Sequence, residues 1–135
     1  MNVNFLAVFV ATLAAFFLGG FWYSPAGFGK IWMKEMGLTK ADIEKVDKSK
    51  MVRSYLLNFV ATFVLGYVLA HLLNLLEADT MKAALETAGW LWLGFVATVQ
   101  VSTVAWEGRS FKHYLVNVSY NLVQFLVMAA ILFSM

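Results

Sequence analysis

The sequence predicts an all-α integral membrane protein, a four-helix bundle that forms one domain over residues 1–135. Hydrophobic residues make up 61% of the chain and charged residues only 13%, whereas about 25% of the residues in soluble domains are charged. The apolar residues form four continuous runs, each close to the ~20 residues that a helix needs to cross the hydrocarbon of a bilayer. Barrel strands would alternate apolar and polar residues, so helices are expected.

The expected spanning helices cover residues 4–23, 51–76, 82–106 and 112–134, with a loop over residues 24–50. The N-terminus lacks the positive charges of a signal peptide, so we expect the first helix to be retained. This helix carries a ladder of small residues at four-residue intervals, Ala7, Ala11, Ala15 and Gly19. Such a ladder lets another helix approach closely in lipid, either inside the bundle or from a second subunit.

Aromatic and turn-forming residues follow the first helix. Trp22 and Tyr23 are typical of an anchor at the membrane interface. Ser24 is a candidate helix cap, and Pro25 suits the first position of a short helix because its missing N–H is not needed there.

The rest of the loop predicts two short helices. Residues 28–36 mix apolar and basic side chains, which predicts an amphipathic helix on the cytoplasmic surface, ended by Gly37. Thr39 and Asp42 have the spacing of a capping box and predict a second helix. The loop is interpreted either as a charged linker on the membrane surface or as a binding arm.

Basic residues are distributed unevenly between the connections. Seven lie at the connection between the first two apolar runs and two at the connection between the last two, whereas the middle connection has only Lys82. The positive-inside rule therefore places loops 24–50 and 107–112 in the cytoplasm and both termini outside. We expect a multi-pass protein of the cell inner (plasma) membrane with a single orientation. A homo-oligomer, with a dimer favoured, would then be parallel.

Polar side chains at helical spacing predict a polar track through the last three helices. Its members are Asn58, Thr62, Gln100, Asn117, Asn121 and Gln124. They extend from roughly 5 Å to roughly 15 Å inside the cytoplasmic aromatic residues, at 1.5 Å of rise per residue. An unpaired amide in hydrocarbon costs several kcal/mol, so these side chains should face the bundle interior or an aqueous cavity. Hydrogen bonding between helices and a path for a solute or ion both remain open.

Short sequence motifs recur along the chain. The sequence from Arg53 to Asn58 is echoed from Lys112 to Asn117, with a base, a tyrosine and an asparagine in the same places. The sequence Phe-Val-Ala-Thr occurs in the first and third expected helices, but also in the second. These matches predict two tandem hairpins related by an axis along the membrane normal, or they reflect chance. The third helix also carries a second small ladder, Gly94, Thr98 and Ser102.

Templates for common chemistry are missing from the sequence. With no cysteine, disulfides and thiolate sites are excluded, and a formal charge of +2 does not suggest nucleic acid. His71 and His113 lie at different depths and lack partner ligands nearby, so no metal site is expected. We find no catalytic residues and expect no cofactor and no enzymatic activity.

Charged residues are absent from the central part of every expected helix, which disfavours a proton-coupled exporter. Glu107 lies at the end of the third helix, where a carboxylate opposes the helix dipole. We therefore expect Glu107 to pair with a cation, and Arg109, Lys112, Arg53 and Lys30 are the candidates.

Several short motifs carry a family resemblance that covers nearly the whole chain. The pattern Trp-Tyr-Ser-Pro followed by Phe-Gly-Lys-x-Trp, together with Glu-Gly-Arg and a later Asn-x-x-Tyr, resembles the bacterial family called domain of unknown function 1761. The resemblance implies a four-helix membrane protein of unassigned activity. The motif residues are Trp22, Tyr23, Pro25, Phe28, Gly29, Lys30, Trp32, Glu107 and Arg109.

The polar track favours a protein that binds or passes a small solute or ion through a parallel homo-oligomer. The alternative is a non-transporting membrane scaffold or a protein that binds lipid or another partner, with headgroups against Lys30 and Trp32. A water-accessible cavity that reaches Asn121 and Gln124 would favour transport, and a dry core of paired amides would not.

Overall fold

The computed structural model describes residues 3–135, and over this range the chain forms helices and no strands. This confirms the all-α class. Four helical segments are long and apolar enough to span a membrane. They are α1 (Phe5–Trp22), α4 (Lys48–Leu75), the segment Met81–Ala105 and α7 (Phe111–Ser134). Two short helices, α2 (Gly29–Met36) and α3 (Lys40–Glu44), connect the first two spans.

Side-chain caps mark where several helices begin. The Asn4 side chain accepts a hydrogen bond from the Ala7 N–H at the start of α1, and Ser110 accepts one from the His113 N–H at the start of α7. Thr39 and Asp42 form the expected capping box of α3. Hydrogen bonds from the Thr39 backbone and side chain lower the pKa of the Asp42 carboxyl. These polar caps satisfy N–H groups that have no partner within the helix.

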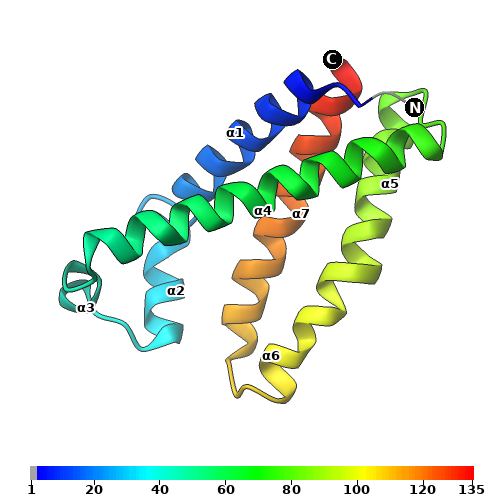
Figure 1. The fold of residues 1–135 in the computed structure, drawn as a ribbon. Coiled ribbons are helices and arrows are strands. Elements are labelled where there is room, and N and C mark those ends of the chain that lie inside the picture. Colours follow the sequence, from blue (N-terminus) through cyan, green and yellow to red (C-terminus); the bar gives the residue numbers. More distant parts are fainter. Residues whose placement is uncertain (1–2) are drawn as a thin grey trace.

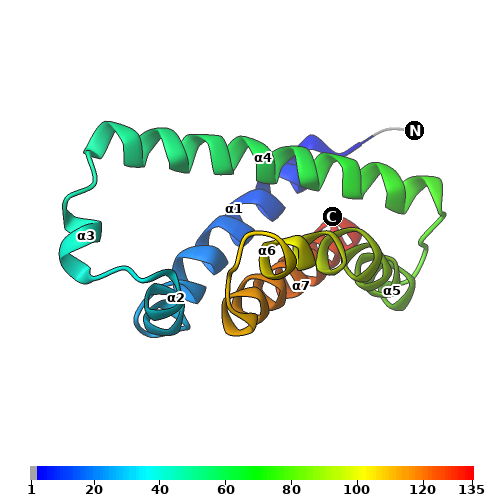
Figure 2. The ribbon, with the colours of Figure 1, turned by 90° about the horizontal axis from the view of Figure 1, so that it is seen from below.

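Helix α7 lies at the centre of the fold. It packs along α1 on one side and α5 (Met81–Trp92) on the other, while α2 lies beside its first turns. Figure 2 shows α2, α7 and α5 in a row, with α1 and the long α4 across from them. Helix α4 crosses α1 at an angle (Figure 1) and packs mainly against it. Because of this crossing, residues 52–58 at the start of α4 are all exposed.

The small residues of α1 pack against other helices of the same chain. Ala7, Ala11 and Ala15 are almost completely buried, and a Cβ on Gly19 would lie 3.0 Å from the Tyr120 hydroxyl of α7. The ladder therefore serves the packing of the bundle, which is the first of the two interpretations from the sequence. Gly66 of α4 has the same role at the helix crossing, since a Cβ there would lie 2.9 Å from Met128.

The turn after α1 differs from the expectation. Helix α2 begins at Gly29 with Phe28 as its cap residue, so the predicted roles of Ser24 as a cap and Pro25 as first helical residue are wrong. The Ser24 hydroxyl instead donates to the Phe21 carbonyl at 2.6 Å. The Phe28 N–H donates to the Trp22 carbonyl at 2.6 Å, which closes a tight turn between α1 and α2.

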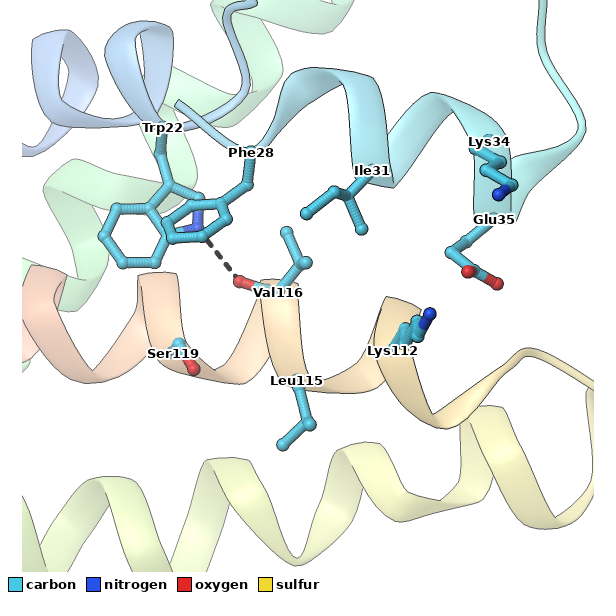
Figure 3. A pocket seen from close by; sticks show the side chains of 9 residues that line it. All are labelled: Trp22, Phe28, Ile31, Lys34, Glu35, Lys112, Leu115, Val116 and Ser119. Carbon is cyan, nitrogen blue, oxygen red and sulfur yellow. Dashed lines mark hydrogen bonds between the residues drawn. The ribbon is translucent and has the colours of Figure 1, made fainter. Parts of the chain in front are cut away.

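Helix α2 is the helix expected over residues 28–36, and Gly37 ends it as predicted, with φ +71°. It packs against the first turns of α7 as part of the bundle, and Figure 3 shows the two helices side by side. Its apolar residue Ile31 faces α7. Burial of apolar area against a neighbouring helix explains this position.

The third span is irregular in its second half. After α5 the chain forms a π-helical turn, η1 (Leu93–Ala97), a 3₁₀ turn, η2 (Val99–Val101), and the short α6 (Ser102–Ala105). Hydroxyl groups compete for backbone carbonyls here: Thr98 donates to Gly94, Ser102 to Val99 and Thr103 to Gln100. Such back-bonding bends helices, and π turns often occur at functional sites.

The two hairpins are not packed as equivalents. A two-fold repeat would pair α1 with α7 in the same way as the third span pairs with α4. Instead α1 packs closely along α7, whereas α4 touches α5 only weakly. Any repeat in the sequence is therefore not matched by symmetric packing.

The turn before α2 generates a stability prediction. A Cβ on Gly29 would collide with the Tyr23 and Ser24 carbonyl oxygens, which belong to backbone and cannot move aside cheaply. We expect Gly29→Ala to lower the free energy of unfolding by about 1–3 kcal/mol, measured by thermal unfolding in detergent. Gly89→Ala is the control, because a Cβ there meets nothing within 4 Å. Equal effects of the two changes would contradict this account of the turn.

Candidate binding cavity

A cavity of about 640 Å³ lies between α1, the connection to α4, the exposed start of α4, η2 and the first half of α7. The residues that line it are mostly polar or aromatic, and none is an aspartate, glutamate, lysine or arginine. They are Phe16, Gly19, Gly20, Tyr23, Trp32, Met33, Ile43, Tyr55, Asn58, Gln100, His113, Asn117, Tyr120 and Asn121. The cavity therefore offers hydrogen bonds and ring surfaces without formal charge.

Three amides form a chain of hydrogen bonds at the inner end of the cavity. The Gln100 Nε2 donates to Asn121 Oδ1 at 2.8 Å, and Asn121 Nδ2 donates to Gln124 Oε1 at 3.2 Å. Gln124 is only 5% exposed and does not line the cavity. The cavity thus reaches Asn121 and ends at a buried amide pair.

A second polar chain lies nearer the loops. The Tyr23 hydroxyl donates to Asn117 Oδ1 at 2.7 Å, and burial raises the pKa of this hydroxyl, which keeps it protonated as a donor. Because Asn117 Oδ1 already accepts a bond, its Nδ2 is the donor toward His113 Nε2, 3.3 Å away. The neutral imidazole then carries its proton on Nδ1.

His113 Nδ1 is the unsatisfied group of the cavity wall. His113 is 7% exposed, and its Nδ1 has no hydrogen-bond partner among the described residues. A buried donor without a partner costs about 1–3 kcal/mol.

Aromatic rings form the rest of the wall. The Tyr23 ring lies edge-on to Trp32 at 5.9 Å and to Tyr120 at 5.5 Å between centroids, and Phe16 meets Tyr55 of α4 at 6.0 Å. The Tyr120 hydroxyl is held by the Ala15 carbonyl at 3.0 Å. These contacts connect α1, α2, α4 and α7 around one space and give it rigid ring surfaces.

The six polar-track residues are brought to one region of the bundle. Asn58, Gln100, Asn117 and Asn121 line the cavity. Thr62 is buried one turn beyond Asn58 and donates to the Asn58 carbonyl at 2.7 Å. The amide of Asn58 is exposed at the cavity edge, because the start of α4 diverges from the bundle.

The motif residues serve the fold and the cavity in different ways. The Trp22 Nε1 donates to the Val116 carbonyl at 3.0 Å, and its ring contacts Phe28. Tyr23 and Trp32 line the cavity, and Gly29 is buried in the tight turn. Pro25 and Lys30 are exposed and do not line the cavity.

Glu107 has no cationic partner, contrary to the expectation. Within residues 3–135 the one ion pair joins Lys82 to Glu86 at 3.9 Å, and Glu107 and Arg109 are exposed. The motif instead forms the turn into α7: Gly108 has φ +71°, and the Arg109 N–H donates to the Thr103 carbonyl at 2.9 Å. Solvent around an exposed carboxylate removes the need for an ion pair.

Phe16, Tyr55 and Tyr120 line the cavity but were not predicted as site residues. Tyr55 precedes Asn58 by three residues and Tyr120 follows Asn117 by three, so the helical faces of predicted site residues would have indicated both. Phe16 gave no signal, because it resembles the other phenylalanines of α1. In the described part of the chain no three His, Cys, Asp or Glu side chains gather as metal ligands.

Comparisons with known proteins agree with the resemblance noted from the motifs. Searches of curated proteins and of solved structures found no match. A family model described as "Protein of unknown function (DUF1761)" matches residues 6–133, nearly the whole length. The chain therefore belongs to the DUF1761 family.

Proposed function

We propose that this protein binds a small uncharged polar solute in the amide-lined cavity and passes it across the membrane. The observation that carries the proposal is the cavity itself, whose wall combines free or exposed polar groups with aromatic rings. Ligand sites commonly have this composition, with few polar groups placed to orient the ligand. A binding role is proposed in preference to catalysis.

The choice of an uncharged solute follows from the lining. Amides, tyrosine hydroxyls and one imidazole are its polar groups, and no residue with a formal charge is among them. A fully charged ligand would lose its hydration without gaining an opposite charge. Asn58 and Tyr55 line the cavity and are exposed, so both side chains can make a new hydrogen bond to a solute.

Passage requires a second step beyond binding. The cavity stops at Asn121, whose Nδ2 bonds to the buried Gln124. A solute that moved further would replace the Gln100–Asn121–Gln124 bonds with its own hydrogen bonds, which keeps the energetic cost of opening small. In this proposal the amide chain is the gate.

Solute entry into reconstituted vesicles tests the proposal. We expect vesicles with the native protein to swell faster than protein-free vesicles in urea or glycerol, and Gln124→Leu to remove this gain because the gate loses its polar partner. Ser134→Ala, at the exposed end of α7, is the control and should behave like the native protein.

Binding is measured on the same proteins as a rise in Tm with solute concentration. Asn58→Leu should weaken binding about 5-fold, the value of one hydrogen bond, whereas Ser54→Leu, one turn away and outside the cavity, should not. If the solute raises Tm but the vesicles do not swell, the protein binds the solute without passing it across the membrane, and the transport part of the proposal is wrong. Neither effect with any solute would contradict the whole proposal.

In this proposal the protein lies in the inner (plasma) membrane with both termini outside and with loops 24–50 and 107–112 on the cytoplasmic side. The asymmetric distribution of lysine and arginine supports this orientation.

Single cysteines test the orientation without interference, because the chain has none of its own. In intact cells a membrane-impermeant thiol reagent should label Asp79→Cys, on the middle connection, and leave Lys45→Cys unlabelled until the cells are opened. The reverse pattern would contradict the orientation, and labelling of both in intact cells would contradict a single orientation.

A parallel homodimer is also part of the proposal. The small ladder of α1 is buried within the chain, but Gly94, Thr98 and Ser102 of the third span are exposed. Small residues at this spacing allow close helix contact in lipid. In a parallel pair each position of a central contact faces its own copy.

Disulfide cross-linking tests the dimer. Thr98→Cys should form a covalent dimer under mild oxidation in the membrane, because the two copies meet at this ladder. Val64→Cys, on the exposed side of α4, is the control and should stay monomeric. Equal cross-linking at both positions would indicate random collision and contradict the specific contact.

A further inference from the structure

A groove of about 390 Å³ lies on the opposite side of α2 from the cavity, between α2 and the first half of α7. Trp32 and Met33 of α2 line the cavity, whereas Ile31, Lys34 and Glu35 line this groove. Helix α2 is therefore the wall between two separate spaces. The groove is independent of the solute proposed for the cavity.

The inner end of the groove is apolar. Trp22 is fixed there by its hydrogen bond to the Val116 carbonyl, and its ring centroid lies 4.8 Å from that of Phe28. Figure 3 shows Ile31 and Val116 facing each other further along. These side chains give the groove a mostly hydrocarbon-like wall, which the Ser119 hydroxyl interrupts at this end.

The outer end of the groove is charged. Lys34 and Lys112 lie there with Glu35 (Figure 3), close to the residue where α7 begins. No ion pair joins these three side chains, so their net charge of +1 is available to a ligand. The groove thus changes from charged to apolar in the direction in which α7 enters the bundle.

We propose that this groove binds one anionic phospholipid of the bilayer. Its phosphate lies between Lys34 and Lys112, and an acyl chain extends past Ile31 toward Trp22. A lipid in a leaflet has the same order of groups along the same direction, with the headgroup at the helix ends and the chain toward the centre. A free phosphate would leave the apolar length of the groove empty.

The position of this site differs from the one expected for headgroups. Lys30 does not line the groove, and Trp32 faces the cavity. The basic groups at the groove are instead Lys34 and Lys112, which come from two helices and meet only because α2 packs on α7.

Charge variants test the headgroup contact by native mass spectrometry of the detergent-solubilised protein with phosphatidylglycerol. The double change Lys34→Gln with Lys112→Gln should weaken binding about 25-fold, since each basic residue contributes about 5-fold. Glu35→Gln should strengthen binding. The double change Lys48→Gln with Lys50→Gln, exposed on α4 and outside the groove, is the control and should have no effect.

Two further experiments test whether the molecule bound in the groove is a phospholipid. Ser119→Phe fills the apolar length of the groove and should abolish phosphatidylglycerol binding, while an excess of inorganic phosphate should not displace the lipid. Displacement by phosphate would overturn the lipid in favour of a simple anion site. Equal retention of phosphatidylcholine, or equal loss in the Lys48 and Lys50 control, would overturn the specific headgroup contact.

Discussion

The fold depends on one constraint: polar groups within the spans must find hydrogen bonds inside the chain, because hydrocarbon supplies none. Helix α7 carries the longest polar stripe, and neighbouring segments supply partners for two of its amides. Tyr23 donates to Asn117, and Gln100 donates to Asn121. Helices that supply these partners must lie against α7, so the polar stripe fixes which helix is central.

Aromatic side chains also donate hydrogen bonds to backbone carbonyls of neighbouring helices. The indole N–H groups of Trp22 and Trp92 reach carbonyls of α7, and the Tyr114 and Tyr120 hydroxyls of α7 reach carbonyls of the third span and α1. Each bond joins two helices at a fixed depth. Small residues such as Ala15 allow the close approach that these bonds need.

The short helix α2 divides the space beside α7 into two. One of its faces closes the polar cavity, and the other forms the apolar groove with its charged outer end. The tight turn at Gly29 makes this possible, because it places α2 against the first turns of α7. A single element thus separates the cavity proposed for a solute from the groove proposed for a lipid.

The sequence by itself determined the class of the protein, its four spanning segments and the residues of the polar track. Composition and run length suffice for these features, because a bilayer requires long apolar helices and excludes unpaired amides. The sequence also showed the capping box at Thr39 and Asp42, since this motif is made by neighbours in the chain.

Only the tertiary structure decided which polar residues meet, where α2 packs and which groups remain unpaired. Because the start of α4 is exposed, Asn58 lies at the edge of the cavity. The His113 Nδ1 has no hydrogen-bond partner among the described residues. Glu107 is exposed to solvent and does not pair with a cation. These outcomes depend on how helices cross and on contacts between residues distant in sequence. Helical periodicity gives the face of one helix, but the packing of the others decides what that face meets.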